Sequence, residues 1–242
     1  IFPKFLYTIP TVQNPTGTIM SEKTRNEILR IAKKYNFLIF EDDCYADLIW
    51  DRKRPRAFYS LCTDSRVIYC GSFSKSIAPS LRVGYIVANW DVISKILSIK
   101  NDGGSGAIEQ IMLANFRNNH FESHAKKLVK DLKSKCDTMI AALDKEFGSI
   151  AEFYVPKGGI FLWVTLPRSV DTNKLSILSS ENGVAINPGS EWVSDPERGN
   201  HKLRLCFANP ENNLISEGIK KLSSICYEEF GVPKVSDNTK RS

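Results

Sequence analysis

Short apolar runs alternate with polar turns through the first half of the chain. Four of these runs predict β-strands, at residues 5–9, 37–40, 67–70 and 83–88. Between the first two runs, Ser21 is placed to cap a helix that continues to about Tyr35 with its apolar positions on one face. Continuous apolar strands are typical of parallel sheets that are covered on both faces. The first half therefore predicts an α/β domain with a mostly parallel sheet.

The second half of the chain has a different pattern, in which helices and strands are mixed. Amphipathic segments predict helices at residues 90–100, 107–118, 121–147 and 212–230. Apolar runs predict strands at residues 152–155, 160–166, 184–186 and 203–207. This mixture favours a separate α+β domain. We predict one domain over residues 1–120, a smaller one over residues 121–233, and a loose polar tail over residues 234–242.

Polar loops follow three of the predicted strands in the first half. Asn14 follows the first strand, Asp42 the second, and the segment from Ser72 to Lys75 the third. In open α/β sheets, ligands bind outside the carboxyl ends of the strands. We therefore expect these three loops to converge on one crevice.

The composition is that of a globular protein and disfavours some classes of function. The 242 residues are 42% hydrophobic and carry a formal net charge of +6. Because the lysines and arginines are scattered, we expect no nucleic-acid partner. No apolar run approaches the roughly 20 residues that span a membrane, so we expect no membrane partner. The chain begins at Ile1 inside an apolar stretch, so we expect further chain before it.

The cysteines and histidines do not form a metal-binding pattern. The six cysteines are Cys44, Cys62, Cys70, Cys136, Cys206 and Cys226, and no two of them form a CxxC pair. His120 and His124 lie four residues apart, but no third ligand accompanies them. We therefore expect no metal, reduced thiols and a cytoplasmic location.

Three motifs in the first half carry the most specific chemical signal. The first consists of Ser72, Ser74, Lys75, Pro79, Arg82, Gly84 and Tyr85. It resembles the SxSKxxxPxxRxGY signature of class I/II aminotransferases, which are fold-type I enzymes dependent on pyridoxal 5'-phosphate (PLP). Asn14-Pro15-Thr16-Gly17 resembles the NPTG motif of that family, and Glu41-Asp42-Asp43-Cys44-Tyr45 resembles its (E)DDxY motif. The resemblance covers nearly the whole chain and is closest to the 2-aminoadipate/kynurenine-type branch.

The resemblance gives the residues of the first domain roles toward PLP. Lys75 would carry the cofactor as an internal Schiff base and act as general base and acid, because an amine on a flexible stem traps a carbonyl. Asp42 would pair with the pyridine nitrogen and keep the ring an electron sink. Tyr45 and Asn14 would hydrogen-bond the phenolate oxygen of the cofactor. The region 1–120 would then be the C-terminal part of a PLP-binding large domain.

The same resemblance assigns the anion-binding side chains. Ser72, Ser74 and Arg82 would hold the cofactor phosphate, because hydroxyl and guanidinium groups are good donors to a dianion. Arg204 lies in an apolar predicted strand, where a charge is costly unless it is paired. It would bind the substrate carboxylate, with Asn14 beside it.

The function implied is transfer of an amino group from an L-amino acid to a 2-oxo acid by a ping-pong route, in a homodimer. Two alternatives stay open. One is the ligand-sensing domain of a transcriptional regulator that carries a DNA-binding module upstream, and the other is a PLP-dependent lyase, since fold does not fix the reaction.

Members of the family carry more chain before the NPTG motif, including an aromatic residue that stacks on the PLP ring and a second phosphate-binding loop. We therefore expect this chain alone to bind PLP weakly.

Overall fold

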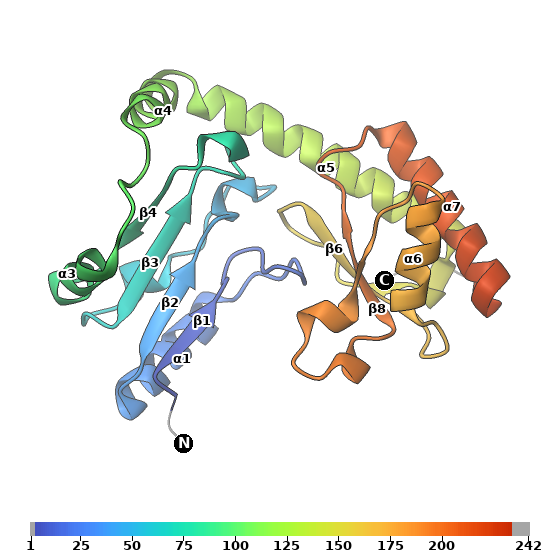
Figure 1. The fold of residues 1–242 in the computed structure, drawn as a ribbon, viewed down its shortest axis with the longest axis horizontal. Coiled ribbons are helices and arrows are strands. Elements are labelled where there is room, and N and C mark those ends of the chain that lie inside the picture. The colour runs from blue at the N-terminus through green and yellow to red at the C-terminus, as the bar shows by residue number, and fades with distance from the viewer. Residues whose placement is uncertain (1–2, 234–242) are drawn as a thin grey trace. The chain divides into compact units, whose positions relative to one another are not determined.

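The computed structural model of the chain describes residues 3–233 and contains two compact units (Figure 1). Unit 1 comprises residues 1–13 and 18–129, and unit 2 comprises residues 14–17 and 130–242. The predicted domain boundary at residue 120 coincides with the start of helix α5 (Phe121–Glu146), whereas the division into units falls inside that helix. The predicted tail, residues 234–242, lies outside the described residues.

Unit 1 is built on a four-stranded sheet in the order β1-β2-β3-β4. Its strands are β1 (Phe5–Thr8), β2 (Leu38–Asp42), β3 (Val67–Ser72) and β4 (Gly84–Val87). The first three are parallel and β4 is antiparallel to β3, which confirms the prediction of a mostly parallel sheet.

Four helices lie in unit 1 before α5. They are α1 (Glu22–Tyr35), α2 (Phe58–Leu61), α3 (Trp90–Ile99) and α4 (Ala107–Asn119). Ser21 caps α1 as predicted, because its hydroxyl accepts a hydrogen bond from the Thr24 N–H at 3.2 Å. Ala32 of α1 and Phe58 of α2 pack with Ile39 of β2 and Val67 of β3 to form a buried core.

The apolar run at residues 83–88 predicted a buried strand, and this prediction is wrong for β4. The other edge strand, β1, is also largely exposed. Phe5 and Tyr7 of β1 are 62% and 53% exposed, and every residue of β4 is exposed. The physical reason is their position, since β1 and β4 are the two edges of the described sheet whereas β2 and β3 are central.

Buried charges fix the end of β2. Glu41 is fully buried and accepts hydrogen bonds from the backbone N–H groups of Phe58 at 2.8 Å and Tyr59 at 3.0 Å, with the Arg25 guanidinium 3.7 Å away. Asp43 is also buried and accepts from the Tyr69 hydroxyl at 3.0 Å. Because side chains alternate along a strand, Asp42 lies on the opposite face from these two anchored neighbours.

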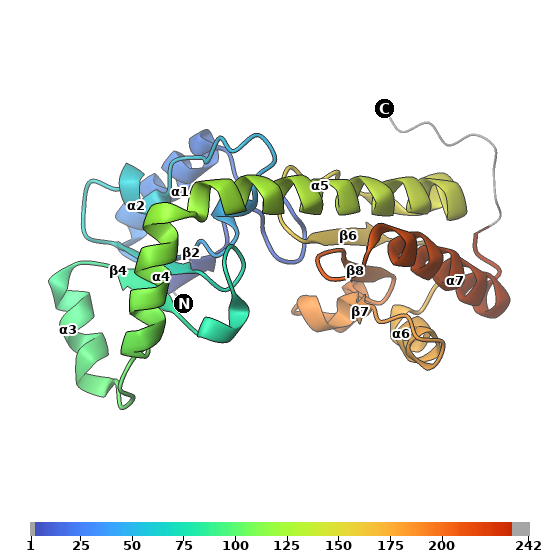
Figure 2. The ribbon, with the colours of Figure 1, turned by 90° about the horizontal axis from the view of Figure 1, so that it is seen from above.

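Unit 2 is an α+β unit with an antiparallel sheet in the order β5-β6-β8-β7. The strands are β5 (Glu152–Phe153), β6 (Phe161–Thr165), β7 (Asn187–Pro188) and β8 (Lys202–Cys206). The helices are the C-terminal part of α5, α6 (Thr172–Glu181) and α7 (Asn212–Phe230). Figure 2 shows α7 beside this part of α5, and the Ser223 hydroxyl donates to the Glu146 carbonyl at 3.0 Å between them.

Two features of unit 2 differ from the sequence predictions. Helix α6 was not predicted, although Asp171 caps it by accepting from the N–H groups of Asn173 and Lys174. The strand predicted at residues 184–186 is wrong. The Val184 N–H donates to the Ser179 carbonyl at 2.8 Å, so this segment terminates α6, and strand β7 begins only afterwards at Asn187.

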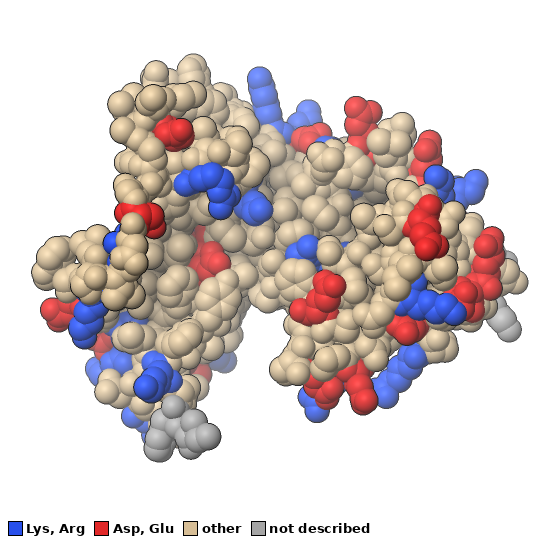
Figure 3. Space-filling view, in the orientation of Figure 1, with Lys and Arg blue, Asp and Glu red and all other residues tan. Residues whose placement is uncertain are grey.

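The surface and helices add two observations. On the face drawn in Figure 3, lysine and arginine side chains are interspersed with aspartate and glutamate. Within residues 3–233, none of the helices combines the length and apolar character needed to cross a membrane.

Candidate cofactor and substrate sites

The predicted cofactor residues of unit 1 lie where β2 and β3 end. Asp42, the last residue of β2, is paired in register with Cys70 of β3, and Ser72 ends β3 two residues later. Lys75 follows in the next turn and is exposed. The sheet therefore brings Asp42 and the Ser72–Lys75 loop to one edge, as expected from the sequence. Asn14 belongs to unit 2, and its convergence with these loops stays a prediction.

The electrostatics of Cys44 show that Asp42 and Lys75 act on the same small region. Burial, together with the Asp42 carboxylate, raises the pKa of the Cys44 thiol to about 12, and the Lys75 ammonium acts in the opposite direction. An anion and a cation are thus held close to one neutral thiol. Tyr45, the next residue, is buried and precedes the short 3-10 helix Ala46–Leu48.

The predicted phosphate ligands form a second group in unit 1. The Ser72 hydroxyl accepts from the Ser74 N–H at 3.2 Å, which holds the loop in a tight turn. Arg82 follows the 3-10 helix Pro79–Leu81 with φ of 51°, and its guanidinium donates to the Pro79 carbonyl at 3.2 Å. Arg82 forms no ion pair with any residue in the described range, so its charge is not balanced there by a carboxylate.

The charged and polar side chains of this group match the chemistry of PLP. A doubly charged phosphate needs cations and hydroxyl or N–H donors, a protonated pyridine nitrogen needs a carboxylate, and an aldehyde needs a primary amine. Unit 1 provides all three kinds of group at adjacent strand ends. The residues present therefore fit this cofactor.

In unit 2, Arg204 of β8 is held in a fixed orientation. Its guanidinium carbon lies 4.2 Å from the centre of the Phe161 ring and 4.1 Å from that of the Trp192 ring. Its Nη1 donates to Asn14 Oδ1 at 2.9 Å and its Nη2 donates to Asn187 Oδ1 at 2.8 Å. Amide oxygens orient a guanidinium without cancelling its charge, so this arrangement suits a planar anion such as a carboxylate.

Two glycines allow the chain segments around Arg204 to pack closely against their neighbours. Gly17 has φ of 69°, and a Cβ there would lie 3.2 Å from Pro156 Cβ. A Cβ on Gly189 would lie 2.5 Å from the Gly199 carbonyl oxygen and 2.6 Å from that of Lys202. The turn that follows Asn187 is therefore packed so closely that only glycine fits at position 189.

Two side chains that the sequence did not single out belong to these groups. The Tyr7 hydroxyl donates to Asp42 Oδ2 at 2.6 Å, and Trp192 lies against Arg204. Alternation along the first strand places Phe5 and Tyr7 on one face, but the partner of Tyr7 depends on strand register. Phe161 and Asn187 lie in motifs that also resemble family motifs near the substrate.

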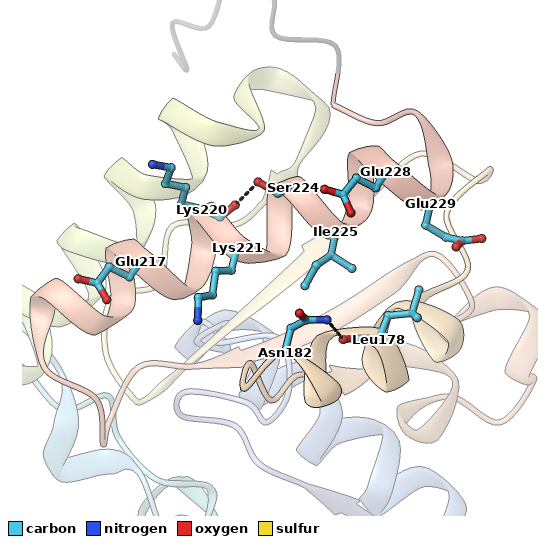
Figure 4. Close-up of a pocket in the computed structure, with 9 residues that line it drawn as sticks. All are labelled: Leu178, Asn182, Glu217, Lys220, Lys221, Ser224, Ile225, Glu228 and Glu229. Atoms are coloured by element: carbon cyan, nitrogen blue, oxygen red, sulfur yellow. Dashed lines mark hydrogen bonds between the residues drawn. The ribbon is translucent and has the colours of Figure 1, made fainter.

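Two further features, the histidines considered as metal ligands and a cavity in unit 2, lie outside the candidate cofactor and substrate sites. His124 bonds the Ser76 carbonyl at 3.0 Å, and the described residues contain no group of His, Cys, Asp and Glu suited to a metal ion. A cavity of about 570 Å³ lies between α6 and α7, lined by residues such as Leu178, Lys221 and Glu228 (Figure 4). It contains none of the predicted site residues.

Comparison with known proteins identifies the family. The family model of the class I and II aminotransferases matches residues 4–222. The chain belongs to this family. It is 35% identical over 230 residues to an uncharacterized aminotransferase, SSO0104, of Saccharolobus solfataricus, covering 94% of this chain and 57% of that protein. It is also 33% identical to YisV, an uncharacterized HTH-type transcriptional regulator of Bacillus subtilis, covering 90% of this chain and 45% of the regulator.

Solved structures of aminotransferases share the fold. LysN, the α-aminoadipate aminotransferase of Thermus thermophilus, complexed with N-(5'-phosphopyridoxyl)-L-leucine, matches with a TM-score of 0.88 and 28% identity over 96% of this chain and 60% of that one. Kynurenine aminotransferase from Pyrococcus horikoshii matches with a TM-score of 0.86 and 33% identity over 93% and 56%. These matches confirm the predicted family, its branch and the fold-type I class.

The chain spans about half the length of the relatives that it matches.

Proposed function

We propose that this chain is part of a PLP-dependent aminotransferase that moves an amino group from an L-amino acid to a 2-oxo acid. The observation that carries the proposal is the placement of Asp42 and the Ser72–Lys75 loop at adjacent strand ends of an aminotransferase fold. When bound, PLP supplies an aldehyde that accepts the amino group and a ring that accepts electrons. The route is ping-pong, because one site serves the donor and then the acceptor.

The residues of unit 1 bind and orient the cofactor. The Lys75 amine would hold the cofactor covalently and would serve as the general base and acid for the proton on the α-carbon of the substrate. The Asp42 carboxylate pairs with the ring nitrogen, and Ser72, Ser74 and Arg82 hold the phosphate.

The residues of unit 2 bind substrate. Arg204 pairs with the carboxylate that every amino acid and 2-oxo acid carries, so one guanidinium serves both substrates of the reaction. Asn14 accepts a hydrogen bond from Arg204. As the family resemblance implies, Asn14 and Tyr45 would each hydrogen-bond the phenolate oxygen of the cofactor. A homodimer and a cytoplasmic location accompany this proposal as expectations from the family.

The similarity to YisV supports one second candidate, the ligand-sensing domain of a transcriptional regulator. Such a domain would bind the same cofactor through the same lysine. It would differ in turnover, since a sensor holds its ligand whereas an aminotransferase converts an amino acid to a 2-oxo acid and transfers the amino group to an acceptor.

The test is an absorbance spectrum of the purified protein with PLP, before and after reduction with borohydride. We expect a band near the visible edge that reduction abolishes, and peptide mass spectrometry should place the reduced cofactor on Lys75. The variant Lys75→Ala should lose the band, whereas Lys95→Ala, which removes an exposed lysine of α3, should keep it. Labelling spread over several lysines and unchanged in Lys75→Ala would contradict the proposal.

A further inference from the structure

The Tyr7 hydroxyl is held against Asp42 by the geometry of the sheet. Tyr7 of β1 is paired in register with Phe40 of β2, and Asp42 lies two residues further along β2 on the same face. The Tyr7 ring stacks on the Phe40 ring with centroids 5.8 Å apart and planes inclined by 29°. The hydroxyl therefore extends past Phe40 and reaches Asp42 Oδ2 at 2.6 Å.

Tyr7 is the donor in this hydrogen bond. Burial raises the pKa of the Tyr7 phenol far above its usual range, and the hydrogen bond to Asp42 and the charge of that carboxylate raise it further. The phenol therefore keeps its proton across the physiological range. An O–H···O⁻ separation of roughly 2.5–2.7 Å is typical of a hydrogen bond to an ionised carboxylate.

The hydrogen bond from Tyr7 orients the Asp42 carboxylate and leaves it able to accept a further hydrogen bond. An ionised carboxylate has two oxygens and about four lone-pair positions, and a phenol donates only one proton. The hydrogen bond to Oδ2 thus restricts rotation of the carboxylate, and the carboxylate keeps lone pairs for a further donor even with the Cys44 thiol hydrogen-bonded to it. Tyr7 lies on an edge strand of the described sheet and is 53% exposed, so its ring packs on Phe40 without being enclosed.

We propose that Tyr7 is a positioning residue of the cofactor site, whose hydroxyl fixes the Asp42 carboxylate for its bond to the pyridine nitrogen of PLP. This inference rests on the proposed function, because it gives Asp42 that partner. Asp43 and Glu41 lie in buried networks on the other face. The Cys44 thiol also hydrogen-bonds Asp42, and Tyr7 adds the short hydroxyl hydrogen bond to Oδ2.

The decisive variant is Tyr7→Phe, which keeps the ring and removes the donor. Hydrogen bonds to charged groups have net values that correspond to about tenfold or more in an equilibrium constant, and partial exposure reduces this effect. We expect the dissociation constant of PLP to rise about three- to tenfold. Tyr59→Phe is the matched control, because Tyr59 is a 42% exposed tyrosine of unit 1 whose ring lies 6.4 Å from that of Tyr69.

A spectroscopic measurement separates positioning from a loss of stability. With PLP labelled with ¹⁵N at the pyridine nitrogen and present at saturation, the ¹⁵N chemical shift reports how strongly that nitrogen holds its proton. We expect Tyr7→Phe to move this shift toward that of neutral pyridine, and Tyr59→Phe to leave it in place. An unchanged shift in Tyr7→Phe would overturn the inference, whatever happens to the melting temperature.

Asp42→Asn distinguishes failure of this inference from failure of the proposed function. If Asp42 pairs with the nitrogen, Asp42→Asn should move the ¹⁵N shift further than Tyr7→Phe does. In the Asp42→Asn background, Tyr7→Phe should then add almost nothing. If Asp42→Asn moves the shift and Tyr7→Phe does not, only the role of Tyr7 is wrong. If neither variant moves it, the role of Asp42 in the proposed function is wrong as well.

Discussion

A guanidinium that contacts two aromatic rings and donates to two amide oxygens has little freedom to rotate. Arg204 is such a residue, because its guanidinium lies against the Phe161 and Trp192 rings and donates to Asn14 and Asn187. Since binding costs free energy whenever a side chain must first be ordered, this pre-orientation lowers the cost of capturing a carboxylate. At the residue scale, we therefore propose that the surroundings of Arg204 prepare it to bind an anion.

Removing one hydrogen-bond acceptor of Arg204 tests whether its fixed orientation aids the binding of a carboxylate. Asn187→Ala deletes the acceptor that lies 2.8 Å from Nη2, so Arg204 should sample other orientations. We expect the dissociation constant of 2-oxoglutarate, measured by titration calorimetry, to rise about three- to tenfold. This is less than the full value of a hydrogen bond to a charged group, because Asn14 and the two aromatic rings still contact Arg204. Asn182→Ala, an exposed asparagine at the end of α6 that bonds the Leu178 carbonyl, is the control. Equal affinity in Asn187→Ala and the wild type would show that Asn187 does not orient Arg204.

At the scale of elements, the sequence predicted what repeats along the chain and missed what depends on tertiary contact. Strands β2 and β3 were found because their apolar runs are continuous, and α1 was found because Ser21 and its apolar face agree. Helix α6 has a weakly apolar face. The segment after it forms no strand at residues 184–186, because the Val184 N–H donates to the Ser179 carbonyl at the end of α6. The apolar pattern alone could not show that α6 is a helix or that residues 184–186 do not form a strand.

The candidate site residues also divide into those that the sequence predicted and those that depend on tertiary contacts. The motifs predicted Asp42, Lys75 and Arg204 individually, because each residue type follows a strand or interrupts an apolar one. The partner of Tyr7 was not predictable, because it depends on the register of β1 against β2 and on the Phe40 ring between them. Trp192 likewise meets Arg204 only after β8 and the turn at Gly189 have packed together.

That turn supports a prediction about stability. Gly189→Ala would place a Cβ within 2.6 Å of two backbone carbonyl oxygens, so the backbone itself must move. We expect the free energy of unfolding, measured with urea, to fall by about 1–3 kcal/mol, the usual cost when added atoms force a packed backbone to shift. Gly218→Ala is a matched control in the same unit, because Gly218 lies inside α7 with nothing within 4 Å of its added Cβ. That variant should gain about 0.5–1 kcal/mol from helix propensity. Similar losses in both variants would contradict the role assigned to Gly189.

At the scale of the whole molecule, two kinds of chemistry are divided between two units. Most of the proposed cofactor ligands lie in unit 1, whereas Arg204 and the side chains that orient it lie in unit 2. Asn14 is the exception that links them along the chain, because residues 14–17 belong to unit 2 while the residues on both sides of them belong to unit 1. The two ligands should therefore stabilise different parts of the backbone.

Hydrogen–deuterium exchange can measure this division. Ligand binding lowers local opening, so exchange slows where the ligand makes its contacts. We expect PLP to slow exchange chiefly at residues 40–46 and 70–84, and 2-oxoglutarate to slow it chiefly at residues 186–206. In Arg204→Lys the second effect should weaken while the first persists, because a lysine cannot reproduce the planar pair of donors. If 2-oxoglutarate instead protected only unit 1, the carboxylate would bind somewhere other than Arg204. The pattern of protection thus assigns each ligand to its unit.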